Sequence, residues 1–150
     1  GRGEFAPISY LPPAEATSHE YPLILTTRRS IFHYHSTLSR KVAGLNVLRG
    51  KEHVEINPVD AAALEIEDGE TVKVASRRGT VQAEARISKT TPPGVVSMTF
   101  HYPETRTNVL THAALDPIAK IPEFKVCAVK IEREIDYAID YAGWGVGKRG

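Results

Sequence analysis

The stretch VEINPVDAAALEIEDGETVKVASRRGTVQAEARIS, residues 54–88, carries the clearest structural signals of the chain. Apolar residues alternate with polar ones in 70–76 and again in 80–88, as expected for two half-buried β-strands. The sequence Arg-Arg-Gly separates the two runs, so we predict a hairpin in which Gly79 takes a positive φ. A β-hairpin is therefore the element of the fold that the sequence predicts most clearly.

Just before the hairpin, a short alternating strand over 54–57 leads directly into a helix over 58–66. Asn57 can accept hydrogen bonds from the first helical turn, and Pro58 suits the first helical position. Asp60 complements the positive end of the helix dipole. The helical spacing directs three side chains toward a core: Ala61, Ala62 and Leu64.

Working outward, three further apolar runs predict strands over 21–27, 95–100 and 124–131. The segments 28–41 and 101–116 match neither period and predict long polar loops, which in compact domains are often functional. About six strands with few helices predict a mainly β protein, built as a small closed or nearly closed barrel.

The ends of the chain have different patterns. Residues 1–20 contain several prolines without periodicity and predict an extended arm. Residues 132–142 are amphipathic, so the 132–150 tail is expected to be helical at first and then disordered. The chain opens without methionine or signal peptide. We therefore expect a piece of a longer protein, with 1–20 leading in from a preceding domain and 21–131 forming the barrel.

Composition excludes several classes. The 150 residues are 41% hydrophobic and 25% charged with a net charge of +1, typical of a globular domain and without a global argument for nucleic acid. No run is long enough for a membrane span. Cys127 is the single cysteine, which excludes an internal disulfide, and its apolar strand predicts a small buried side chain.

Catalytic and metal-binding patterns are missing from the sequence. There is no Gly-x-Ser-x-Gly nucleophile motif, and no phosphate-binding glycine loop precedes a helix. His33 and His35 lie two residues apart but have no nearby carboxylate to complete a metal site. We expect no catalytic and no metal-ligating residue in this segment.

The strongest local signal is charge. Residues 26–51 include six basic side chains and no acidic one, together with several hydroxyls and the aromatic residues around 32–35. Arginine and hydroxyl groups bind phosphate, and flat rings stack on a heterocycle, so the segment predicts a nucleotide-like ligand. A solvated basic face and a single-stranded nucleic acid site are alternatives. The strands offer no aromatic platform for the latter, and Phe100 and Phe124 are expected in the core.

Several motifs in order resemble the C-terminal dinucleotide-binding domain of the molybdopterin oxidoreductases. They are YPLILTT (21–27), HYH (33–35), VEINP (54–58), VASRRG (74–79), NVLT (108–111) and PEFKVCAV (122–129). The ending over 116–129 is most similar to the catalytic (alpha) subunit of formate dehydrogenases. Arg28 departs from the pattern, because the family commonly has glycine there, and it implies extra charge at that turn.

The resemblance implies a double-psi β-barrel that binds one side of bis(molybdopterin guanine dinucleotide), the cofactor that carries molybdenum or tungsten. Position by position, it assigns a first cofactor loop with Thr27, Arg29, Ser30, His33, His35 and Thr37. It assigns His101 and Asn108 to a second loop, and Lys125 to the approach from the last strand.

The implied activity is the reversible oxidation of formate to CO2, with the catalytic residues and iron–sulfur clusters in other domains or subunits. The implied partners are the preceding domains of the same subunit and electron-transfer subunits, without nucleic acid or a membrane span. A cytoplasmic enzyme is expected, with the periplasm as an alternative. Two other functions stay open: a separately encoded pterin-binding subunit, as in formylmethanofuran dehydrogenases, and a non-enzymatic protein-binding barrel module.

Overall fold

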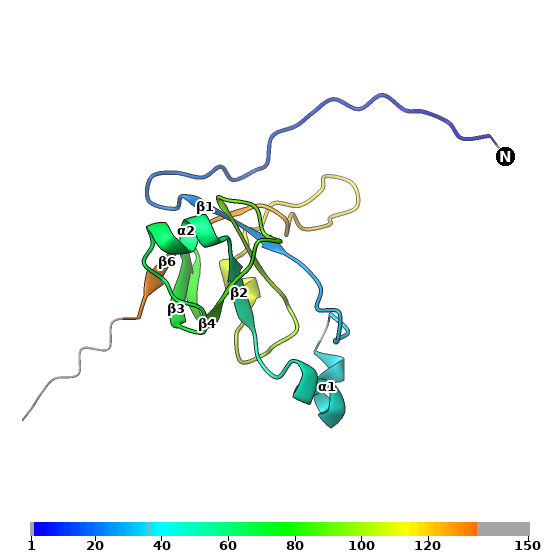
Figure 1. Ribbon diagram of the computed structural model, residues 1–150. Helices are drawn as coiled ribbons and strands as arrows, with labels where there is room; N and C mark the ends of the chain where they lie inside the picture. The colour runs from blue at the N-terminus through cyan, green and yellow to red at the C-terminus, as the bar shows by residue number, and fades with distance from the viewer. Residues whose placement is uncertain (1, 36, 135–150) are drawn as a thin grey trace, which may run out of the picture.

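The computed structural model describes residues 2–35 and 37–134, in which six strands close into one barrel in the order β1-β5-β2-β4-β3-β6 (Figure 1). The strands are β1 Leu23–Thr27, β2 His53–Ile56, β3 Thr71–Ser76, β4 Gly79–Ile87, β5 Val95–Met98 and β6 Cys127–Arg133. The helical elements are short: α1 Ala43–Leu48, α2 Pro58–Ala63 and the 3-10 turns η1 Leu38–Lys41 and η2 Thr107–Leu110. The mainly β fold and the closed barrel predicted from the sequence are confirmed.

The barrel interior is filled by branched aliphatic side chains. Each strand contributes alternate residues, because successive side chains of a strand point to opposite faces. Leu25, Val54, Val74, Val96 and Val129 are fully buried. Full burial of one such side chain contributes about 1.5–3 kcal/mol, so this cluster is the main stabilising element of the fold.

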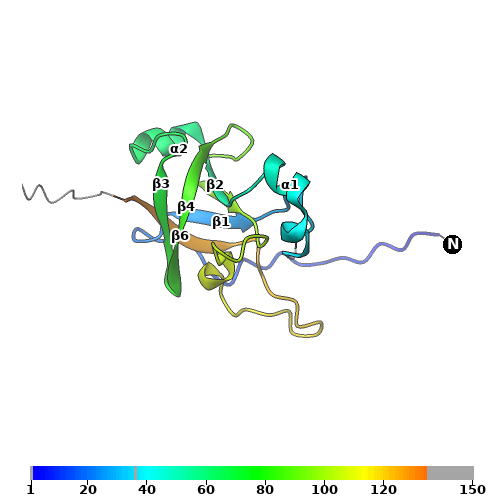
Figure 2. The same ribbon diagram turned by 90° about the horizontal axis from the view of Figure 1, so that it is seen from below.

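The order of the strands brings two loops to one end of the barrel. β1 and β5 are parallel neighbours, with Thr27 opposite Met98, so the chain leaves both strands in the same direction. β2 is antiparallel to β5, and α2 therefore follows it at the other end. Figure 2 shows α1 and α2 at separate ends of the barrel. The two loops expected to be functional thus start side by side.

The predicted start of α2 is confirmed. The Asn57 side chain accepts a hydrogen bond from the Val59 amide at 2.9 Å, and its own amide group donates to the main-chain oxygen of Thr91 at 2.7 Å. Ala61 is buried as predicted, but Ala62 is exposed. That expectation was wrong because α2 is only six residues long and presents a single narrow face to the barrel.

The hairpin of β3 and β4 is confirmed, but the reason for its glycine differs from the prediction. Gly79 lies in the ladder opposite Ser76, and its φ is not positive. A Cβ at this position would overlap the side chain of Val109, which covers the turn. The glycine is therefore needed for a close approach between the hairpin and η2.

Several boundaries differ from the sequence prediction. The segment 28–41, expected as a loop, ends in η1, and α1 follows at 43–48, where no element was predicted; both are too short to produce a periodic pattern, and none of their residues is buried. β5 ends at Met98 rather than at Phe100. β6 begins at Cys127 rather than at 124 and continues to Arg133. The rest of the tail helix predicted over 132–142 falls on 135–142, outside the described residues.

The N-terminal arm is attached to the barrel through Glu15. Its carboxylate accepts hydrogen bonds from Arg77 at 2.8 Å, from Arg78 at 2.8 Å and from the amide of Ala128 at 2.9 Å. These donors hold the pKa of Glu15 at about 2, and the hydrogen bond from Arg78 is the largest cause. The arm therefore crosses the hairpin turn and the start of β6. The division into arm, barrel and tail domains stays a prediction.

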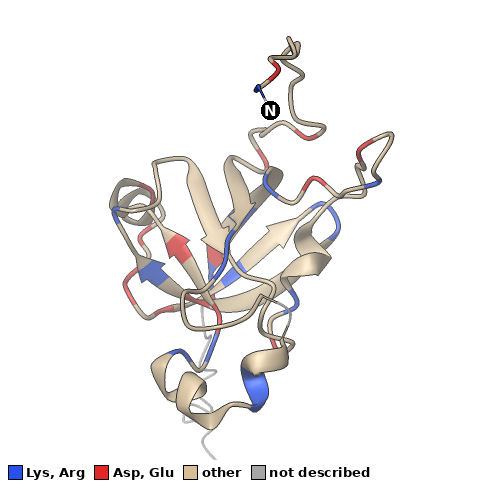
Figure 3. Cartoon of the chain, turned by 90° about the vertical axis from the view of Figure 1, so that its right-hand side faces the viewer, with Lys and Arg blue, Asp and Glu red and all other residues tan. Residues whose placement is uncertain are grey.

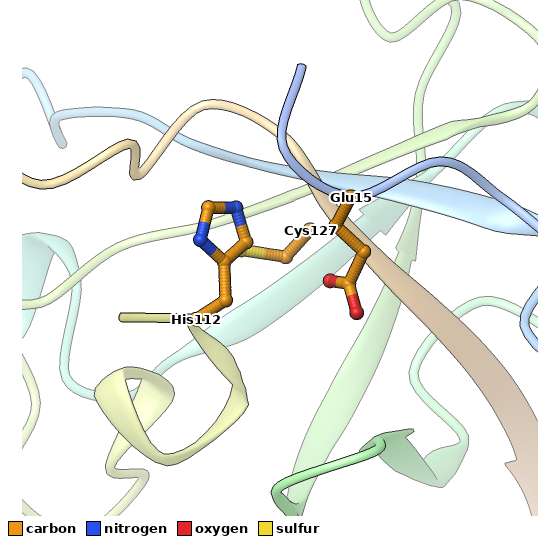
Figure 4. A group of neighbouring side chains, drawn as sticks. All are labelled: Glu15, His112 and Cys127. Carbon is orange, nitrogen blue, oxygen red and sulfur yellow. The ribbon is translucent and has the colours of Figure 1, made fainter. Parts of the chain in front are cut away.

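Glu15, His112 and Cys127 lie together where the arm meets β6, with their potential ligand atoms within 4.8 Å of one another (Figure 4). Both ring nitrogens of His112 are already engaged: Nε2 donates to the Val126 oxygen at 2.8 Å, and Nδ1 accepts from the Ala114 amide at 3.2 Å. Burial raises the pKa of the Cys127 thiol. The group is thus a packing contact, and Cys127 is buried as predicted.

Candidate functional site

A cluster of cationic and polar groups lies where the chain leaves β1. The Lys125 ammonium donates a hydrogen bond to the main-chain oxygen of Thr27. Burial lowers the pKa of His35, and the positive charges of Arg29 and Lys125 lower it further. The Nδ1 atom of His35 is buried without a hydrogen-bond partner. Four predicted residues therefore meet in one place.

A pair of histidines joins the two loops beside this cluster. The rings of His33 and His101 stack with centroids 4.0 Å apart. Nδ1 of His101 donates to the main-chain oxygen of Tyr34 at 2.7 Å, and Nε2 of His33 donates to that of Arg49 at 2.7 Å. His101 is fully buried, and its Nε2 has no partner. This nitrogen is an unused acceptor between the loops.

A groove of about 260 Å³ lies along the second loop and brings the remaining predicted residues together. Thr37 from the first loop and Asn108 from η2 both line it, with Phe100 on its wall. Both polar residues are exposed. Phe100 also contacts the cationic cluster, since its ring centroid lies 5.3 Å from that of His35.

Phe100 and Phe124 were expected in the core, and this expectation was wrong. Both are only partly buried, and their rings contact each other edge to face at 4.9 Å. Phe100 follows β5 and Phe124 precedes β6, so both lie outside the barrel interior that their apolar character suggested.

Ser30 has a local role, since its hydroxyl accepts a hydrogen bond from the Phe32 amide at 3.3 Å.

The basic character of residues 26–51 is largely neutralised by acids from other parts of the chain, which the local sequence could not indicate. Arg40 pairs with Glu104 at 2.5 Å, Lys51 pairs with Glu84, and Arg28 and Arg49 both pair with Glu55. Figure 3 shows acidic residues interspersed with basic ones over the barrel. Within the described residues, Arg29 and Lys125 form no ion pair with an acid. These two cations are available to an anionic ligand.

Sequence reasoning missed two residues that contact the loops. Glu55 is 3% exposed although it occupies the polar position of an alternating strand. Tyr102 is buried, and its hydroxyl donates to the main-chain oxygen of Arg49 at 2.9 Å. No local pattern could have identified these partners, because they lie far from one another in the sequence.

Comparison with known proteins places this arrangement in a family. Residues 23–128 match the family described as "Molydopterin dinucleotide binding domain". The match covers more than half of the chain, so the chain belongs to the molybdopterin dinucleotide-binding domain family.

Among curated proteins, the chain is 52% identical over 134 residues to the F420-dependent formate dehydrogenase subunit alpha of Methanocaldococcus jannaschii, covering 89% of this chain and 20% of that subunit. It is 38% identical over 121 residues to the periplasmic nitrate reductase of Desulfovibrio desulfuricans, covering 80% of this chain and 16% of the reductase. The chain thus spans about a fifth of the length of the curated relatives it matches. In the formate dehydrogenase subunits, the matched part is the C-terminal region.

Among solved structures, acetylene hydratase from Pelobacter acetylenicus has a TM-score of 0.69 over 76% of this chain and 18% of its own, at 18% identity. This likeness supports the barrel fold. Within residues 2–35 and 37–134, no helix is long and apolar enough to cross a membrane.

Proposed function

We propose that this domain binds and orients bis(molybdopterin guanine dinucleotide) in a formate dehydrogenase. The observation that carries the proposal is the pair of acid-free cations, Arg29 and Lys125, beside the unpartnered Nδ1 of His35 at the mouth of two converging loops. A pyrophosphate requires cations and hydrogen-bond donors of this kind. The sequence identity is 52% to the formate dehydrogenase alpha subunit and 38% to the nitrate reductase, which supports formate as the substrate.

The donor set fits each part of the proposed cofactor. Arg29 and Lys125 would hold the phosphates. Asn108, which offers paired donors and acceptors in the groove with Thr37, suits the edge of a guanine or pterin ring. The unpartnered Nε2 of His101 would accept a hydrogen bond from a ring N–H. Together these residues offer partners for the phosphates and for a ring edge, and none of them is proposed as a ligand to the metal.

When bound, the cofactor supplies the molybdenum or tungsten centre that accepts two electrons from formate. The residues of this chain bind and orient it, and they exclude water from the buried face of the site. The preceding domains, the electron-transfer subunits and the cytoplasmic location expected from the sequence stay predictions. Matches to alpha subunits favour a domain of a larger subunit over a separate pterin-binding chain.

The test uses the full-length alpha subunit that contains this domain, with Arg29→Ala, Lys125→Ala and the double variant. Loss of one charge-assisted phosphate contact is expected to cost about 1.5–3 kcal/mol, so cofactor occupancy should fall in each single variant and further in the double variant. Occupancy is measured as metal content and as guanine nucleotide released on denaturation.

The matched control is Lys89→Ala, which removes an exposed cation after β4, at the opposite end of the barrel. Its metal and nucleotide contents should equal those of the wild type. Wild-type contents in the folded double variant would contradict the proposed phosphate site.

A further inference from the structure

The first cofactor loop begins and ends at arginines that contact the same buried carboxylate. Arg28 directly follows β1 and forms an ion pair with Glu55 of β2. Arg49 directly follows α1, and its Nη2 lies 3.7 Å from the same carboxylate oxygen of Glu55. Because the chain between these two arginines contains Arg29, His33 and His35, Glu55 holds both ends of the segment that presents them.

The surroundings of Glu55 are crowded with positive charge. In the barrel ladder Glu55 lies opposite Arg86 of β4 and opposite Ser97 of β5. Burial lowers the pKa of Arg28, and the positive charges of Arg49 and Arg86 lower it further, whereas the carboxylate of Glu52 raises it, so the three arginines act on one another electrostatically. Glu55 is the acid that two of them share. Removing its charge would leave the largely buried Arg49 and its neighbour Arg28 without the carboxylate that they share.

Arg49 connects this carboxylate to both loops through its main chain. The Arg49 oxygen accepts a hydrogen bond from Nε2 of His33 at 2.7 Å and another from the Tyr102 hydroxyl at 2.9 Å. His33 belongs to the first loop and Tyr102 to the second, and the ring of Tyr102 packs edge-on against both His33 and His101. The position of Arg49 therefore sets the spacing between the loops.

From these contacts we infer that Glu55 is a positioning residue, which acts through Arg28 and Arg49 to fix the spacing of the two cofactor-binding loops. The inference rests on the proposed function in one respect, namely that the loops bind the cofactor. The coupling of the loops by Glu55 is a property of this chain alone and can be measured without any ligand.

The test is Glu55→Gln in the full-length alpha subunit, since glutamine keeps the shape of the side chain and removes its charge. In cofactor-free protein, amide hydrogen exchange should become about tenfold faster or more in residues 29–35 and 100–102, with the barrel strands unchanged. After cofactor loading, nucleotide content should fall below that of the wild type. Glu70→Gln is the matched control, because it removes a carboxylate paired with Arg133 at the other end of the barrel.

Tyr102→Phe provides a second variant that leaves the ion pairs intact. It removes one hydrogen bond to Arg49, so faster exchange should be confined to the second loop. If Glu55→Gln does not fold, Glu55→Asp takes its place, because it keeps the charge but shortens its reach to Arg28 and Arg49; exchange should again become faster in both loops, and unchanged exchange would overturn the positioning role.

The possible results separate the two proposals. Unchanged exchange in both loops of Glu55→Gln would overturn the positioning role, whatever the variants of Arg29 and Lys125 do. Faster exchange with wild-type nucleotide content would also overturn it, because loop spacing would then not govern binding. The proposed function itself fails only if the double variant of Arg29 and Lys125 keeps its cofactor.

Discussion

The imidazole rings of His33 and His101 stack face to face, with centroids 4.0 Å apart and planes inclined by 17°. The two residues lie far apart in sequence, one after β1 and the other after β5. Each ring donates a hydrogen bond to a main-chain oxygen, so each ring is held in a fixed orientation. The stack is the most direct contact between the two proposed cofactor loops.

The stack should make stability depend on pH. Burial lowers the pKa of His101 below its ordinary value near 6.5, and the neighbouring His33, Arg40 and His35 lower it further. Because the unfolded chain takes up a proton first, this contribution to stability is complete above pH 6.5 and decreases as the pH falls below it. His101→Asn keeps a donor for the Tyr34 oxygen but does not titrate.

Urea unfolding at pH 7.5, 6.5 and 5.5 tests this expectation. The free energy of unfolding should fall more steeply on acidification in the wild type than in His101→Asn. Equal slopes for the two proteins would exclude His101 as the titrating group.

The contact between Glu15 and the two arginines should respond to a lower pH range. Its pKa of about 2 lies below the ordinary 4.5, mainly because of the hydrogen bond from Arg78. The resulting stabilisation is fully present above pH 4.5 and is lost as the pH falls toward 2. Since the pair is partly exposed to solvent, we expect Glu15→Gln to cost about 1 kcal/mol at pH 7.

The difference in free energy of unfolding between wild type and Glu15→Gln should be constant from pH 7 to 5 and narrow below 4.5. Limited proteolysis should cleave the arm faster in the variant at neutral pH. A difference that does not change with pH would assign the effect to packing and not to the charge of Glu15.

The close approach of Gly79 and Val109 predicts a compensating pair of substitutions. Gly79→Ala should destabilise the chain by about 1–3 kcal/mol, because the new methyl group overlaps the valine side chain. Val109→Ala removes the atoms that clash, so the double variant should be more stable than the Gly79→Ala single variant. The coupling energy from chemical denaturation of the four proteins measures this, and additive effects would contradict the clash.

Much of the barrel could be predicted from the sequence because its strands have local signatures. Alternation over 70–88 predicted the β3–β4 hairpin, and the Asn57-Pro58 pair predicted the start of α2. The wrong or missing predictions concern features that have no local signature. α1 is too short to produce a period, and Gly79 is explained by a side chain thirty positions away at Val109.

The candidate site was likewise predictable only in part. Ordered motifs assigned Arg29, His35 and Lys125 to one ligand, and the structure brings these residues together. The basic composition of residues 26–51 did not indicate which cations are available to a ligand, because Arg28 and Arg49 are neutralised by Glu55 of β2. A count of charges within residues 26–51 does not include Glu55, which lies just beyond that segment and reaches Arg28 only through the fold.

The sequence by itself determined the class of fold, the approximate positions of the strands and the family, since periodicity, capping residues and ordered motifs are local properties of a chain. Tertiary structure alone decided which cations stay available to a ligand and which are paired. It also decided that the two loops meet, because the parallel pairing of β1 with β5 directs both to one end of the barrel. The contact between His33 and His101 follows from that pairing, and no pattern within either loop contains it.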